Sequence, residues 1–245
     1  MSKYLKVFDT NIDYSNWENS EEWITPNVAF IKDSNNVTFN PHIPPVSDPF
    51  NGHEYVDLGL PSGTLWAKCN IGAEKESDYG LYFAWGETVG YKDVSSGKNF
   101  TLYDYELENG DTCDGIFTKY DLRDGLTTLE PPDDAATVNM GGSWRMPTES
   151  EFNELLSNTT NTWTTVEGVY GKLFTGNNGN TLFFPTSGFC DDGYVGLVGS
   201  DGNYWSSSLS SSNLNYGLCL SFSSGYCGGF GLNRYQGLPV RGVIS

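Results

Sequence analysis

The fold of this chain is decided by residues 55–67, which read YVDLGLPSGTLWA. Residues 55–60 predict a strand, the Pro-Ser-Gly at 61–63 predicts a tight turn, and residues 64–69 predict a second strand. Further strands are expected over 82–86, 162–165, 170–174 and 181–185, with a hairpin turn at 176–180. The many short strands and Gly-rich turns predict a chain with much β structure.

One helix is predicted over residues 147–156, PTESEFNELL. Thr148 is the expected N-cap, and Glu151 three residues later completes a capping box. Phe152, Leu155 and Leu156 then share one face of the helix, which can pack on a core. A helix among short strands places the main domain, residues 46–245, in the α+β class.

Residues 1–45 are assigned to a separate N-terminal β arm with a linker. Strands are expected over 4–8, 28–31 and 37–39, with a hairpin turn at Asn35-Asn36. Residues 40–45, NPHIPP, predict a stiff extended linker. Because so short a segment buries little area alone, we expect it to dock on a partner chain or on the main domain.

The charge of the chain excludes several ligands. Thirteen basic and 31 acidic residues give a net charge of -18, although charged residues make up only 18% of the chain and aromatic residues 15%. An acidic chain is repelled by nucleic acid and by anionic membranes. No segment approaches the roughly 20 apolar residues of a membrane span. The start of the chain lacks the apolar core of a signal peptide, so we expect the protein in a host-cell cytoplasm or a virion.

Two features raise the question of metal binding. Residues 104–134 hold ten acidic and two basic side chains, which indicates a solvated loop, with a calcium loop as the alternative. No D-x-[DN]-x-[DN]-G run supports the calcium loop. The five cysteines (Cys69, Cys113, Cys190, Cys219 and Cys227) form no C-x-x-C pair, which favours reduced thiols over disulfides or zinc. We therefore predict no metal and no cofactor.

The C-terminal block, residues 201–236, has an unusual composition. Ser, Gly, Asn, Tyr and Cys fill 25 of its 36 positions, and only Asp201 and Arg234 are charged. Antibody-like binding surfaces have this composition, because Tyr offers contact area at low entropy cost and Ser, Gly and Asn offer adaptable hydrogen bonds. A meander of Gly- and Ser-rich surface loops without a partner is the alternative.

An ordered series of sequence blocks carries a family resemblance. The blocks are 55–67, 78–80 (DYG), 82–87 (YFAWGE), 133–136 (DDAA), 141–148 (GGSWRMPT), 204–208 (YWSSS) and 239–241 (PVR). Together they resemble the paralogous surface domain of gut Bacteroidetes and their phages. The resemblance implies a C-type-lectin-like fold, related to formylglycine-generating-enzyme domains. Residues 4–9 and 26–28 are more weakly similar to N-terminal segments of Bacteroides phage proteins.

Some members of this family are variable proteins of diversity-generating retroelements, in which template adenines, often in AAC codons, are randomised. Such codons yield Asn, Ser, Tyr, Cys, Gly, Asp and Phe among others, but not Lys, Glu, Gln, Met or Trp. Residues 224–231, SGYCGGFG, fit this restriction, whereas Trp205 and Gln236 would be fixed. Trp205 and Arg241 would be scaffold, and core packing is expected of Tyr204, Trp205, Phe222 and Tyr235.

The resemblance implies an exposed ligand-binding face in the C-terminal block. The expected ligand-binding residues are Asn203, Asn213, Asn215, Tyr216, Ser224, Tyr226, Cys227, Gly229, Phe230 and Asn233, with Asp191, Asp192 and Tyr194 at the margin. The expected ligand is a protein or glycan on a bacterial surface, and residues 1–45 would attach the domain to a virion or join it into a homo-oligomer.

Catalytic interpretations have less support from the residues. Cys219 and Cys227 are spaced by eight, which fits no copper site that we can defend, and His42 and His53 lack partner motifs. The chain has many acidic residues, but no motif identifies two of them as the paired carboxylates of a glycosidase. Calcium-dependent sugar binding lacks its Glu-Pro-Asn triplet, since Glu130 is followed by Pro131 and Pro132. We predict a non-enzymatic recognition protein, with an invariant structural module, or an oxidase or hydrolase of the related fold, as alternatives.

Overall fold

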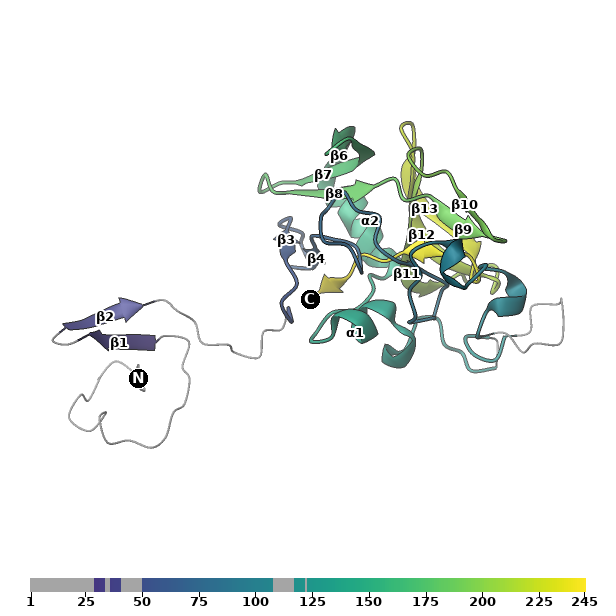
Figure 1. Cartoon of the computed structure of the whole chain (residues 1–245), viewed down its shortest axis with the longest axis horizontal. Coiled ribbons are helices and arrows are strands. Elements are labelled where there is room, and N and C mark those ends of the chain that lie inside the picture. The colour runs from purple at the N-terminus through teal and green to yellow at the C-terminus, as the bar shows by residue number, and fades with distance from the viewer. Residues whose placement is uncertain (1–28, 34–35, 41–49, 108–116, 122) are drawn as a thin grey trace. The chain divides into compact units, whose positions relative to one another are not determined.

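The computed structural model describes residues 29–33, 36–40, 50–107, 117–121 and 123–245 (Figure 1). The chain divides into two compact units, residues 1–48 and 49–245. In the first unit β1 (Ala29–Asp33) pairs with β2 (Asn36–Asn40) in antiparallel fashion. This confirms the two later strands of the predicted arm. The predicted strand over 4–8 and Asn35 of the predicted turn lie outside the described residues.

The second unit is built mainly from short strands. Their bounds are β3 (Tyr55–Asp57), β4 (Leu65–Ala67), β5 (Tyr82–Phe83), β6 (Thr159–Val166), β7 (Val169–Gly176), β8 (Thr181–Pro185), β9 (Phe189–Asp191), β10 (Tyr194–Gly196), β11 (Gly202–Leu209), β12 (Tyr216–Phe222), β13 (Cys227–Asn233), β14 (Leu238–Pro239) and β15 (Val243–Ile244). They form three three-stranded sheets, β15-β4-β3, β6-β7-β8 and β11-β12-β13, and the two-stranded pairs β9-β10 and β5-β14. With few helices among them, these strands confirm the α+β class.

The longer helix of this unit is the predicted one. Helix α2 (Glu149–Asn158) follows Thr148, whose side chain accepts from the Glu151 N–H at 3.3 Å, while the Glu151 carboxylate accepts from the Thr148 N–H at 2.8 Å. This reciprocal pair is the capping box that the sequence predicted. Phe152 and Leu155 are buried, so the apolar face of α2 packs on the core.

A second helix, α1 (Ala135–Met140), was not predicted. Asp134 caps it by accepting from the Thr137 N–H at 2.8 Å, and the same carboxylate accepts from the Met146 N–H. The described residues also form the short 3-10 helices η2 (Val94–Ser96), η3 (Leu102–Asp104) and η4 (Pro131–Asp133). None of the helices in the described ranges is long and apolar enough to cross a membrane.

Strands β3, β4 and β5 are shorter than the sequence predicted, whereas β6 and β7 are longer. Gly59 adopts a φ of 66°, a conformation that few other residues tolerate, so β3 ends at Asp57 and not at residue 60. Strand β5 ends at Phe83, and a turn follows in which the Glu87 N–H donates to the Ala84 carbonyl at 3.0 Å and Gly86 adopts a φ of 84°. The predicted turn over 176–180 does join β7 to β8, with the Gly179 N–H donating to the Gly176 carbonyl at 2.9 Å.

The C-terminal end of the chain closes the domain against its first strands. Strand β15 pairs with β4, and β14 pairs with β5. Between them Arg241 is fully buried and donates to the Asn70 side chain at 2.7 Å and to the Phe183 carbonyl at 3.0 Å. Arg241 therefore ties together segments far apart in the sequence, which is the scaffold role expected of it.

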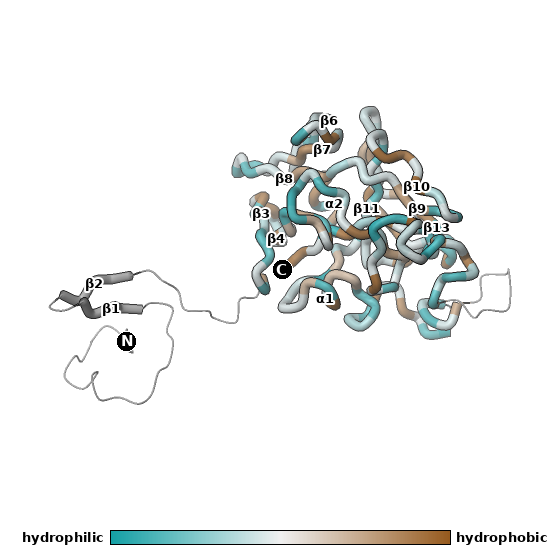
Figure 2. The backbone as a smooth tube through the Cα atoms, in the orientation of Figure 1, coloured by the Kyte–Doolittle hydropathy of each residue, from teal (hydrophilic) through white to brown (hydrophobic). Residues whose placement is uncertain are grey.

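The sheet β11-β12-β13 lies between two hydrophobic clusters. Trp205 and Cys219 belong to the first cluster with Trp85 and Trp144, and they are opposite each other in the register of β11 and β12. Tyr204, Leu220 and Phe222 belong to the second cluster with Phe152 and Trp66. Hydrophilic residues occupy many of the outer loops of this unit (Figure 2). Both faces of β11 and β12 are therefore covered, and β13 forms one edge of the sheet.

The acidic stretch over 104–134 is described only in part, since residues 108–116 and 122 lie outside the described residues. Lys119 lies 2.6 Å from both Glu130 and Asp133, and Lys98 forms a buried ion pair with Glu87. In the part of the chain that the structure describes, no three His, Cys, Asp or Glu side chains gather as a metal site would require.

Candidate functional site

The candidate ligand-binding site is the β12–β13 surface, which we define as Tyr216, Ser224, Tyr226, Cys227, Gly229, Phe230 and Asn233. Strands β12 and β13 pair in antiparallel register from Tyr216 opposite Asn233 to Phe222 opposite Cys227. The Ser223 N–H donates to the Tyr226 carbonyl at 3.0 Å and closes the turn between them. Residues predicted from composition thus meet on one hairpin at an edge of the domain.

Two aromatic side chains on this hairpin are exposed. Tyr226 is 48% exposed and Phe230 is 55% exposed, whereas Trp205, Leu220 and Phe222 of the same sheet are buried. The Tyr226 hydroxyl donates to the Gly229 carbonyl at 3.1 Å, which holds the ring along β13. Exposed aromatic rings fixed on a strand are the anchors that recognition surfaces use.

The glycines around these rings leave the strand uncovered. A Cβ atom at Gly229 would meet nothing within 4 Å, and Gly229 is itself exposed. Cys227 is half-buried against the second cluster, and burial raises the pKa of its thiol above the usual value. Cys227 is therefore protonated at neutral pH and contributes as a small apolar side chain.

The opposite end of the hairpin carries the asparagines. The Asn213 side chain accepts from the Asn215 N–H at 3.0 Å, and the Tyr216 N–H donates to the Asn213 carbonyl at 3.0 Å. Asn215 is exposed, while Asn213, Tyr216 and Asn233 are half-buried. This loop therefore places amide and phenol groups at the start of β12, beside the end of β13.

The marginal acidic residues join this same end of the hairpin. Gln236 donates to the Asp191 carboxylate at 2.8 Å and accepts from the Asn233 N–H at 3.0 Å. Burial raises the pKa of Tyr235, as do the charges of Asp191 and Asp192 near it. The β9–β10 hairpin is thereby linked to β13, and its Tyr194 is 66% exposed.

Asn203 is a correction to the predicted site. Asn203 is only 6% exposed, because segments outside the sheet cover β11. Beyond β11 the Leu129 N–H donates to the Ser207 carbonyl and Gly188 bridges to Gly202, so neighbouring segments cover this side. Asn203 has the same residue type as Asn213, Asn215 and Asn233, and it differs from them in its place in the sheet.

Three of the four aromatic residues that were expected to pack in the core are buried. Tyr204, Trp205 and Phe222 are buried, whereas Tyr235 is half-buried and lies at the site. Gln236 was expected to be fixed, and its two hydrogen bonds give it a positioning role between Asp191 and Asn233. No sequence signal indicated that role, because the bonded partners are far apart in the chain.

Arg234 holds the end of β13 in place. Its guanidinium is fully buried, lies 3.9 Å from the Phe117 ring centre and 4.8 Å from that of Trp85, and donates to the Tyr105 hydroxyl at 3.0 Å. It also donates to the carbonyls of Lys119 and Tyr120. Among the described residues no carboxylate forms an ion pair with it. Aromatic rings and carbonyls thus hold this charge, and its partners come from other segments.

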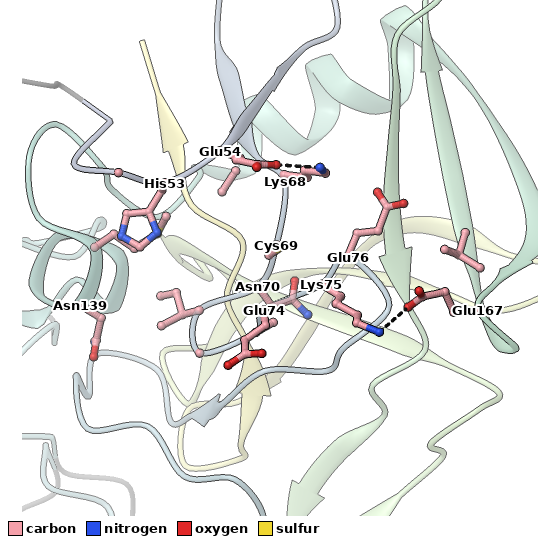
Figure 3. Close-up of a pocket in the computed structure, with 17 residues that line it drawn as sticks. His53, Glu54, Lys68, Cys69, Asn70, Glu74, Lys75, Glu76, Asn139 and Glu167 are labelled. Atoms are coloured by element: carbon pink, nitrogen blue, oxygen red, sulfur yellow. Dashed lines mark hydrogen bonds and ion pairs between the residues drawn. The ribbon is translucent and has the colours of Figure 1, made fainter.

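A separate cavity of about 580 Å³ contains none of the predicted site residues (Figure 3). Lys68 pairs with Glu54 at 2.7 Å, and Lys75 pairs with Glu167 at 3.4 Å. Burial raises the pKa of the Cys69 thiol, so this thiol is a poor nucleophile at neutral pH. The cavity therefore gives no support to a cysteine-based reaction.

No protein-family model, curated protein or solved structure matches this chain.

Proposed function

We propose that this chain is a non-catalytic recognition protein that binds a bacterial surface molecule through the β12–β13 surface. The observation that carries the proposal is the exposure of Tyr226 and Phe230 on a nearly uncharged hairpin of an acidic chain. Tyr and Phe anchors surrounded by Ser, Gly and Asn are typical of adaptable binding surfaces.

We also propose that the domain has a C-type-lectin-like fold and that its exposed hairpin is diversified by a retroelement. Support comes from where the residue types lie. Ser224, Tyr226, Gly229 and Phe230 are exposed, and all are products of randomised AAC codons. Trp205, which such codons cannot produce, is buried.

Gene sequencing tests the diversification directly. We expect a C in the third codon position at the exposed residues, and a near-repeat of this segment beside a reverse transcriptase gene. Other third bases across residues 224–231, or flanking DNA without such a repeat, would instead favour an invariant structural module of a surface assembly.

Cell binding tests the recognition function. The fluorescently labelled full chain is titrated on a panel of Bacteroidetes strains, beside a double variant with Tyr226→Ser and Phe230→Ser. A matched control replaces Tyr170, a 50% exposed tyrosine on β7, with serine. We expect the double variant to lose at least tenfold in affinity and the control to keep wild-type binding. Equal binding of all three proteins to every strain would contradict the assignment of this surface.

In this proposal residues 1–45 attach the domain to a virion or to further copies of the chain. The observation behind it is the separation of residues 1–48 as a compact unit with its own hairpin. Measuring the mass of the full chain and of residues 49–245 by light scattering tests the oligomer. If the full chain and residues 49–245 were both monomers, the arm would not join copies of the chain, and its proposed role would be attachment to another virion protein.

A further inference from the structure

The outer edge of β13 carries unpaired backbone groups. In the sheet order β11-β12-β13 this strand pairs with β12 on one side, and no strand of the described residues pairs with its other side. An edge strand presents N–H and C=O groups that a further strand can bond. The direction of each backbone group of β13 follows from its register with β12.

The bonds at the two ends of the hairpin decide this. Ser223 bonds Tyr226 at one end, and the Arg234 N–H donates to the Asn215 carbonyl at 2.9 Å at the other. In an antiparallel ladder bonded pairs alternate with unbonded pairs, so every second residue points its backbone groups away from the partner. With this register Gly228, Phe230 and Leu232 bond β12, whereas Cys227, Gly229 and Gly231 point outward.

Few of these outward groups have partners among the residues that the structure describes. The Gly229 carbonyl accepts from Tyr226, and a carbonyl has room for a second donor. For the outward groups of Cys227 and Gly231 and for the Gly229 N–H, no bond to another described residue is present. These groups recur every second residue, or about every 6.6 Å, which is the repeat of an extended polypeptide.

The edge also lacks two of the features that keep strands apart, although helix α2 packs close to β13. Natural edge strands are protected by charged residues, by prolines or by covering loops. β13 reads CGGFGLN, without a charge or a proline, and its glycines place no side chain beside the outward groups at 229 and 231. Open space around a Gly229 Cβ allows a second backbone to approach closely.

We propose that β13 binds an extended polypeptide segment of the ligand by strand addition, with Tyr226 and Phe230 contacting its side chains. This inference rests on the proposed recognition function and names the class of ligand, a protein strand. The ligand strand is expected to carry Lys or Arg, since the chain has a net charge of -18 and Asp191 and Asp192 lie near Tyr235, two residues beyond β13. The same charge disfavours a second copy of this chain as the occupant.

A library of displayed random linear dodecapeptides, selected against the immobilised full chain, tests the inference. Enriched peptides are measured against wild type, Gly229→Pro and Gly229→Ala. Proline removes the outward N–H and leaves the bonds to β12, whereas alanine keeps the N–H and meets open space. We expect basic peptides that bind wild type and Gly229→Ala alike and bind Gly229→Pro at least tenfold more weakly, at equal thermal stability of the variants.

Amide hydrogen exchange gives a readout that does not depend on the proline variant folding. In the free chain we expect fast exchange at Gly229 and Gly231 and protection at Gly228 and Phe230. Peptide binding should then protect Gly229 and Gly231.

The strand-addition inference would be overturned if no peptide were enriched, if Gly229→Pro bound as well as wild type, or if both glycines exchanged fast in the complex. Binding to a glycan array that is insensitive to Gly229→Pro would do so as well. The recognition function would survive any of these results if the Tyr226 and Phe230 double variant still lost cell binding. It would fall separately if that variant bound cells normally.

Discussion

Replacing Arg234 with methionine removes a guanidinium that the fold buries completely. Methionine keeps much of the apolar volume but donates no hydrogen bond. The Tyr105 hydroxyl and the carbonyls of Lys119 and Tyr120 would lose their donor, which lies 3.0 to 3.2 Å from each of them in the native chain. The substitution therefore isolates the contribution of a buried charge held by aromatic rings and carbonyls.

The expected cost follows from these contacts. Three lost hydrogen bonds at about 1 kcal/mol each give about 3 kcal/mol. Loss of the ring contacts with Phe117 and Trp85 adds about 2 kcal/mol for a desolvated cation. Relief of the buried charge offsets about 2 kcal/mol of this total. We expect a net loss of about 3 kcal/mol, because the abandoned carbonyls stay buried, which lowers the unfolding midpoint by about 6 to 12 °C.

Urea unfolding of the full chain, followed by tryptophan fluorescence, measures this loss. Arg234→Lys keeps the charge without the planar fork and should lose an intermediate amount. Arg123→Met is the matched control, because the Arg123 side chain is 70% exposed and donates to Asp121 and to the Phe117 carbonyl, so it should change the stability by no more than about 1 kcal/mol. If Arg234→Met were as stable as wild type, or no less stable than the Arg123 variant, then the aromatic rings and carbonyls around Arg234 would not stabilise the domain as we argue.

Three further predictions concern the packing, the pH dependence and the thiols. Gly202→Ala should destabilise the domain by well over 1 kcal/mol in urea unfolding, because its Cβ would lie 2.1 Å from the Phe222 ring. Gly229→Ala should be nearly neutral, because its Cβ would meet open space. Equal effects of the two variants would contradict this description of the packing. Burial opposes ionisation of Glu151, but hydrogen bonds, led by the one from Arg145, outweigh burial and lower the pKa of this carboxyl below 4.5. The stability lost in Glu151→Gln should therefore be largest above pH 5 and should vanish as the pH falls through the folded pKa. A constant stability difference between pH 7 and pH 3 would refute this. Burial raises the pKa of Cys190 to about 12, so alkylation at pH 7.5, read by mass spectrometry, should modify it only after unfolding.

Local signals predicted the elements that depend on local chemistry. The capping box of α2 requires only Thr148 and Glu151, three residues apart, and it formed as predicted. The β7–β8 hairpin likewise follows from a Gly- and Asn-rich turn between two apolar runs. Helix α1 was not predicted, because its six residues carry little periodic signal and Asp134 is followed three residues later by Thr137, not by the Glu or Gln of a capping box.

The sequence indicated the binding surface through composition, and the tertiary structure decided which residues belong to it. Asn203 and Asn233 are the same residue type in the same block, but β11 is covered on both sides and β13 is a free edge. Exposure depends on strand order, which is a property of long-range pairing that composition does not record.

By itself the sequence determined the acidic charge, the α+β class, the caps and turns, and the concentration of Tyr, Ser, Gly and Asn near the C-terminus. Only the tertiary structure decided that Arg234 is buried among aromatic rings, that Gln236 links Asp191 to β13, and that Gly229 points its backbone outward. The physical reason is range. Caps and turns form between neighbours in the chain, whereas burial and the free edge of a sheet arise when distant segments pack together.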